Sequence, residues 1–112
     1  MGQPELGNRT KRWLQDLDRV LDQSSALAAR GYEAYCSDPA LPLAIEALCL
    51  RAGEIAKRLI AADPERFSDE IWILVARTRD FLAHHYDRVD VDVLWATANR
   101  DFPALHELVR GL

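Results

Sequence analysis

The stretch PLAIEALCLRAGEIAKRLIAA, residues 42–62, decides the fold. Drawn as an α-helix, it gathers its apolar side chains into one broad stripe: Ile45, Leu48, Cys49, Ala52, Ile55, Ala56, Leu59 and Ile60. Pro42 suits the first turn of a helix, and Asp63 with Pro64 ends it. The sequence predicts an all-α bundle built around this helix and the one that follows it.

An earlier helix is expected over residues 10–35, where apolar side chains also recur at helical spacing. Thr10 is a suitable N-cap for it, and Gly31 weakens its end. Residues 1–8 are polar and contain Gly and Pro, so we expect the chain to be loose up to about residue 9.

A third helix is expected from Ser68, whose hydroxyl could cap it, to about Tyr86. The β-branched and aromatic run Ile71–Val75 would also suit a buried strand. Apolar residues continue at helical spacing as far as His85, however, and this favours a helix.

The C-terminal part predicts two shorter helices. Asp90 can cap the first, and Asp101 with Pro103 opens the second, which ends before Gly111. Five helices in 112 residues need no second domain, so we expect one domain over residues 1–112.

Composition excludes several classes of protein. No apolar run approaches the roughly 20 residues of a membrane span, and an intracellular protein is expected. A net charge of -4 argues against binding long nucleic acid without regard to sequence, although a local basic cleft is compatible with it. Cys36 and Cys49 form neither a disulfide framework nor a zinc motif, and both are expected to be small buried side chains.

The densest group of functional side chains is the string RTRDFLAHHY, residues 77–86. Asp80 and His84 are i,i+4 neighbours, with Arg77 one turn back. A carboxylate there can orient the imidazole and favour its charged form, which suits general acid/base chemistry. Arg79 and His84 diverge by roughly 140° on a straight helix. Two copies meeting across a twofold axis would help both to act on one substrate.

The same string also has a purely structural interpretation. Arg and His near a helix C-terminus complement the helix dipole and often form a solvated face, and spacing alone favours this interpretation. His85 lies on the apolar stripe, so we expect it to be packed. His106 is isolated in the last helix and is expected at the surface.

A family resemblance changes this balance. The string from Arg79 to Tyr86 resembles the R-x4-6-H-x-Y signature of HepT-like toxins, which belong to the HEPN superfamily of helical ribonucleases. Further segments resemble the family in the same order. They are Ala52–Leu59, similar to "GEAAKRL", Trp72 at the family's tryptophan, Val89–Trp95, similar to "vdleivW", and Asp101–Pro103 with Leu105. The resemblance covers roughly residues 45–105.

The resemblance implies a homodimeric HEPN-like bundle of about five helices. It also implies a cytoplasmic toxin that cuts RNA, such as tRNA, without a metal or cofactor and is paired with a minimal nucleotidyltransferase antitoxin. His84 would move protons at the ribose 2′-OH and the leaving oxygen, and Arg79 would stabilise negative charge on phosphorus. Arg77 and Asp80 would support this site. Tyr86 would be the hydroxyl onto which the antitoxin transfers AMP.

The sequence departs from the family pattern at several positions. Asp80 stands where Asn is usual, and its charge would oppose RNA phosphate unless Arg77 or His84 holds it. His85 replaces a commonly small residue, and the usual proline before the tryptophan is missing. Glu54 either faces the cleft or is a solvated helix residue. Asp80 therefore leaves open an alternative, a non-catalytic HEPN module that binds its nucleotidyltransferase partner. An unrelated helical dimerisation domain is a third interpretation.

Overall fold

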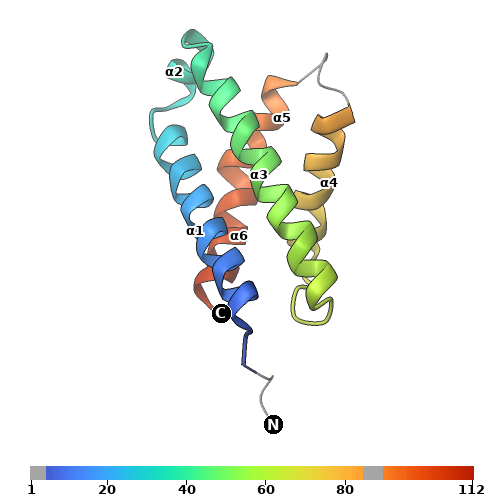
Figure 1. The fold of residues 1–112 in the computed structure, drawn as a ribbon. Coiled ribbons are helices and arrows are strands. Elements are labelled where there is room, and N and C mark those ends of the chain that lie inside the picture. Colours follow the sequence, from blue (N-terminus) through green and yellow to red (C-terminus); the bar gives the residue numbers. More distant parts are fainter. Residues whose placement is uncertain (1–4, 85–89) are drawn as a thin grey trace.

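Helices make up most of the computed structural model, which describes residues 5–84 and 90–112 (Figure 1). They are α1 (Asn8–Ala28), α2 (Tyr32–Ser37), α3 (Ala40–Ala62), α4 (Glu70–His84), α5 (Val91–Ala96), the π-helical segment η2 (Thr97–Asp101) and α6 (Phe102–Arg110). No strand occurs among the described residues, which confirms the predicted all-α fold.

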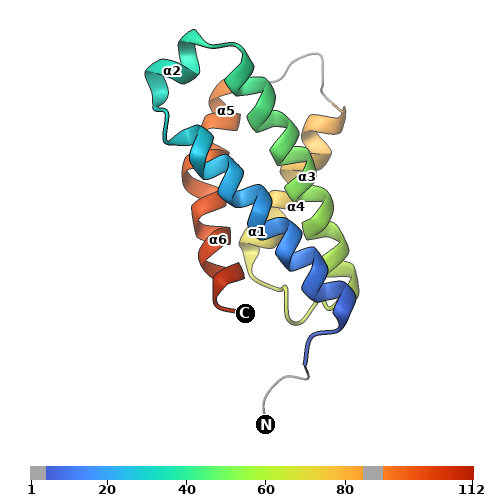
Figure 2. The same ribbon diagram turned by 60° about the vertical axis from the view of Figure 1, so that its left-hand side comes forward.

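Helix α3 is the centre of the bundle. It packs against α4 on one side and α1 on the other, while α6 packs against α1 (Figures 1 and 2). Its predicted stripe is buried almost throughout, as the low exposure of Ile45, Ala52 and Leu59 shows. Phe67 and Trp72 pack edge to face, with ring centroids 4.9 Å apart, where the chain turns from α3 into α4. Burial of this stripe is the main apolar contribution to folding.

The predicted first helix, residues 10–35, is divided into two. Gly31 has a φ of 93°, which a helix cannot contain, and α1 therefore ends at Ala28 before α2 begins. The predicted cap at Thr10 is also wrong, because α1 begins two residues earlier, after Gly7, without a side-chain cap.

The start of α4 differs by one residue from the prediction. Asp69, rather than Ser68, caps it, since the Asp69 carboxylate accepts a hydrogen bond of 3.0 Å from the Ile71 backbone N–H. The run Ile71–Val75 is helical, as predicted. The predicted end at Tyr86 lies outside the described residues.

The C-terminal helices form one continuous helical path. Asp90 caps α5 as predicted and accepts hydrogen bonds from the backbone N–H groups of Asp92 and Val93. Asp101 does not open a new helix, because α5 continues through η2 directly into α6, and its buried carboxylate pairs with Arg100 instead of a backbone N–H.

The cysteines differ in environment. Cys49 is buried in α3, as expected, whereas Cys36 is exposed on the short α2, so the prediction that both are buried is wrong for Cys36. No helix in the described part of the chain is long and apolar enough to cross a membrane.

Candidate active site between helices α3 and α4

The site begins with an unusually close approach of two helices. A Cβ atom added to Gly53 of α3 would lie 2.0 Å from the Cβ of Arg79 and 2.9 Å from the backbone oxygen of Val75, both in α4. Real side chains do not tolerate such distances, so only glycine fits at this crossing. The close approach brings the polar residues after Gly53 within reach of the predicted catalytic string.

Arg79 is held by carboxylates on both sides. Its Nε lies 3.4 Å from Oε2 of Glu54, and its Nη1 donates a hydrogen bond of 3.1 Å to Oδ1 of Asp80. The Arg79 side chain is 30% exposed. Glu54 in turn pairs with Arg58, whose Nε lies 3.5 Å from Oε1. The guanidinium is thus fixed in orientation while remaining accessible from solvent.

Asp80 is compensated from the neighbouring helix. Lys57 donates a hydrogen bond of 2.9 Å from its Nζ to Oδ1 of Asp80. The hydrogen bonds from Lys57 and then Arg79 lower the pKa of the Asp80 carboxyl below its ordinary value. The sequence suggested Arg77 or His84 as the partner of this carboxylate. The structure places it on Lys57 and Arg79 instead.

His84 is oriented by the backbone. Its Nδ1 lies 2.7 Å from the backbone oxygen of Asp80. A carbonyl oxygen can only accept a hydrogen bond, so Nδ1 carries the proton, and in the neutral ring Nε2 keeps its lone pair. Asp80 therefore orients the His84 imidazole, as predicted, but through its backbone carbonyl and not through its side-chain carboxylate.

A groove of about 1110 Å³ runs between α1, α3 and α4 beside Arg79, and its lining does not include Lys57, Asp80 or His84. Arg79, Glu54 and Arg58 line it together with two further arginines, Arg19 and Arg51. Three carboxylates also line this groove, those of Glu54, Asp16 and Glu46. The four guanidinium groups outnumber the three carboxylates, so the groove is a locally basic surface on an acidic protein.

Other predicted site residues lie elsewhere. Arg77 is exposed and lines a separate hollow beside Ile73 and Leu74, so it does not contribute to the groove that contains Arg79. Tyr86 and His85 lie outside the described residues. Sequence reasoning missed Lys57 and left Glu54 undecided. A signal for both was present in the sequence, since charged side chains stand one and four positions after a glycine in a helix, where a second helix can approach closely.

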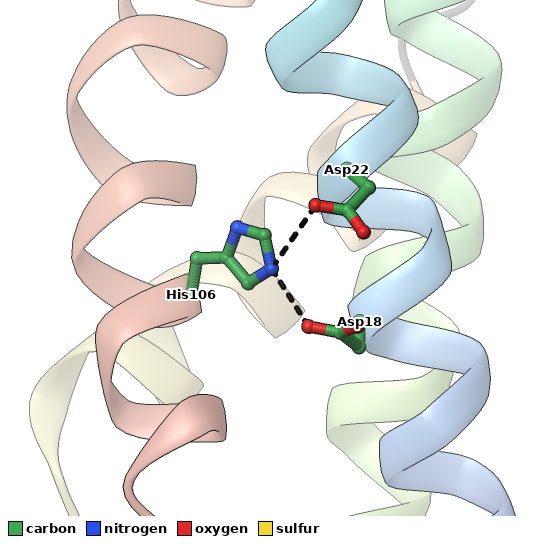
Figure 3. Close-up of side chains that lie close together, drawn as sticks. All are labelled: Asp18, Asp22 and His106. Atoms are coloured by element: carbon green, nitrogen blue, oxygen red, sulfur yellow. Dashed lines mark hydrogen bonds and ion pairs between the residues drawn. The ribbon is translucent and has the colours of Figure 1, made fainter.

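The prediction of a surface position for His106 is wrong. Its side chain is 9% exposed, and its Nε2 lies 2.7 Å from Asp18 Oδ1 and 3.6 Å from Asp22 Oδ1, both on α1 (Figure 3). Arg110 Nη2 lies 3.4 Å from the same Asp22 oxygen. These contacts link α6 to α1 and make the cluster an interhelical connection. The residues of this cluster line neither the groove nor the α3–α4 crossing.

The chain is similar to known proteins over most of its length. A family model described as ribonuclease HepT-like matches residues 14–112. A Thermococcus cleftensis protein named as a probable ribonuclease HepT is 47% identical over 60 residues, which cover 50% of this chain and 54% of that protein. A Caldanaerobacter subterraneus subsp. tengcongensis protein named as a candidate RNase is 29% identical over 100 residues, which cover 86% of this chain and 89% of that protein.

The first of these alignments spans only about half the length of the relative, whereas the second spans most of it. No solved structure matches the chain. The family match extends from the second turn of α1 to the C-terminal residue and includes α3 and α4 with all the site residues described above. With this coverage and an all-α bundle, the chain belongs to the HepT-like ribonuclease family.

Proposed function

We propose that the protein is a metal-independent endoribonuclease and the toxin of a toxin-antitoxin pair. The observation that carries the proposal is the arrangement on α4: an accessible, oriented Arg79 guanidinium beside a groove, and a His84 imidazole whose Nδ1 is engaged by the backbone. Family membership supports ribonuclease chemistry for this pair.

In the proposed reaction the ribose 2′-oxygen attacks the adjacent phosphorus. His84 Nε2 takes the proton from the 2′-OH as the new oxygen–phosphorus bond forms. Arg79 stabilises the charge that gathers on the phosphoryl oxygens. The bond to the 5′-oxygen then breaks as that oxygen receives a proton from the protonated His84 imidazole of a second copy of the chain, and the products are a 2′,3′-cyclic phosphate and a free 5′-OH. Every step uses groups of the chain and needs no metal ion.

The reaction requires both a base and an acid, and each chain offers one His84. We therefore propose a homodimer in which the α4 faces of two copies share the substrate. Ile73 and Leu74 of α4 are 39% and 41% exposed and are suited to such an interface. Light scattering at micromolar concentration should give the mass of two chains. A fully active monomer would contradict the shared site.

Cleavage assays in EDTA test the catalytic assignment. His84→Ala and Arg79→Ala should each lower cleavage on the order of 10²-fold or more, because positioned acid/base and charge-stabilising groups contribute that much. Arg12→Ala removes an exposed cation from α1 and is the matched control. Structured RNA such as tRNA is the proposed substrate class. Full activity of His84→Ala would refute the assignment.

The proposal includes a nucleotidyltransferase antitoxin that transfers AMP to Tyr86. It rests on the resemblance of the string ending at Tyr86 to the toxin signature. A bulky anion attached there would compete with RNA phosphate for Arg79. After coexpression, intact mass should show added AMP in the parent and none in Tyr86→Phe. Neutralisation of both proteins alike would mean inhibition by binding alone.

A non-catalytic module that only binds the nucleotidyltransferase is the alternative outcome of these experiments. Asp80 was the feature that kept it open, because an uncompensated carboxylate would oppose phosphate. The ion pairs of Asp80 with Lys57 and Arg79 weaken that objection. Partner binding together with an RNA-inactive parent protein would favour the alternative.

A further inference from the structure

We propose that Glu54 and Lys57 of α3 are positioning residues for the ribonuclease site. Glu54 fixes the guanidinium of Arg79, and Lys57 neutralises Asp80 so that RNA phosphate can approach. The inference rests on the proposed ribonuclease function and goes beyond it, because neither residue belongs to the R-x4-6-H-x-Y string. The close helix crossing at Gly53 brings both residues next to Arg79 and Asp80 of α4.

The charges around Arg79 form one connected network across two helices. It runs from Arg58 to Glu54, from Glu54 to Arg79, from Arg79 to Asp80 and from Asp80 to Lys57. Three cations and two carboxylates leave one net positive charge. Without Lys57 the network is neutral, and Asp80 is paired only with Arg79, the cation that the proposed reaction itself needs. Lys57 therefore leaves Arg79 available to phosphate.

Glu54 has a different role, because it sets direction rather than charge. Its Oε2 faces Nε of Arg79, while Asp80 faces Nη1, so the two carboxylates fix the plane of the guanidinium. A long side chain held in this way does not have to be ordered when the substrate binds. Removal of Glu54 makes the groove more positive but leaves Arg79 less well oriented. Electrostatics and positioning therefore predict opposite effects on cleavage.

A double-mutant cycle tests Lys57. Lys57→Met should lower kcat/KM on the order of 10-fold, the scale of one uncompensated charge near a phosphate. In the Asp80→Asn background the same substitution should have little effect, because no charge remains to neutralise. Lys11→Met is the matched control, since Lys11 is the only other lysine of the chain and lies on α1. Equal losses in both backgrounds would overturn the role of Lys57.

A second readout for Lys57 does not depend on activity. Carboxyl NMR titration should find a higher pKa for Asp80 in Lys57→Met than in the parent, at a temperature where both proteins are folded. An unchanged Asp80 pKa would show that the pair does not form in solution. If the parent protein cuts no RNA, the proposed function fails, while the titration still tests the pair.

Glu54 is tested by a conservative and a radical substitution. Glu54→Gln keeps an acceptor oxygen for Arg79 and should stay within a few-fold of the parent. Glu54→Leu should lower kcat on the order of 10-fold with a smaller change in KM, because misplacement affects the transition state most. Higher activity of Glu54→Leu, as expected from its added net positive charge, would refute the positioning role.

Discussion

The substitution Gly53→Ala tests the crossing that assembles the site. The new Cβ would lie 2.0 Å from Arg79 Cβ, whereas ordinary contacts begin at about 3.4 Å, so α4 must move by roughly 1.5 Å. Overpacking of this kind costs about 3 kcal/mol, and the better helix propensity of Ala offsets about 1 kcal/mol. We expect a net destabilisation of about 2 kcal/mol, which corresponds to a thermal midpoint roughly 10 °C lower.

The assay is thermal unfolding followed by circular dichroism, together with RNA cleavage at a temperature where the variant is folded. Gly111→Ala is the matched control, because a Cβ there lies 3.6 Å from its nearest atoms and the backbone is already right-handed helical. Cleavage by Gly53→Ala should fall along with its stability, since Arg79 is displaced. A variant as stable and as active as the parent would refute the close crossing.

Three further predictions concern other parts of the molecule. Burial raises the pKa of the Cys49 thiol to about 12, so iodoacetamide at pH 8 should add one group, at the exposed Cys36, to the native protein and two after unfolding, as read by intact mass. Asp18→Asn removes the nearer of the two carboxylates beside His106 and should lower the free energy of unfolding by about 1–2 kcal/mol in urea titrations, and an unchanged midpoint would contradict the connection between α1 and α6. The pKa of the Asp80 carboxyl is lowered from its ordinary value of 3.8, so the charged carboxylate stabilises the folded protein fully above pH 3.8. This contribution to the free energy of unfolding is lost as the pH falls through the lower pKa of the folded state. The stabilities of the parent and Asp80→Asn should therefore differ at neutral pH and converge only below pH 3.8.

The sequence predicted the helices well where apolar periodicity and a breaking residue coincide. The stripe of residues 42–62 became α3, and Asp63 ended it where expected. The errors arose where one local signal had two possible outcomes. Gly31 was interpreted as a weak end of one helix, but its positive φ divides two. Asp101 resembles an N-cap, yet a π-helical segment carries the backbone past it without a break.

The site was predictable only as far as one helix determines it. Residue spacing along α4 correctly related Asp80 to His84, because these groups are one turn apart. The partners of Arg79 and Asp80 come from α3, and periodicity in one helix contains no information about the register of another. His106 was misplaced for the same reason, since its two carboxylates lie in α1, far away in sequence.

The position of Asp80 shows how a departure from the family pattern can be accommodated by another helix. An aspartate next to an arginine on one helix would lower the positive potential that phosphate requires. Lys57 of α3 restores the positive potential by pairing with the Asp80 carboxylate. It reaches Asp80 because Gly53 lets the two helices approach so closely. Asp80, Lys57 and Gly53 thus depend on one another. We therefore expect the effect of any one of them on RNA cleavage to change when another is substituted, which independent surface residues would not do.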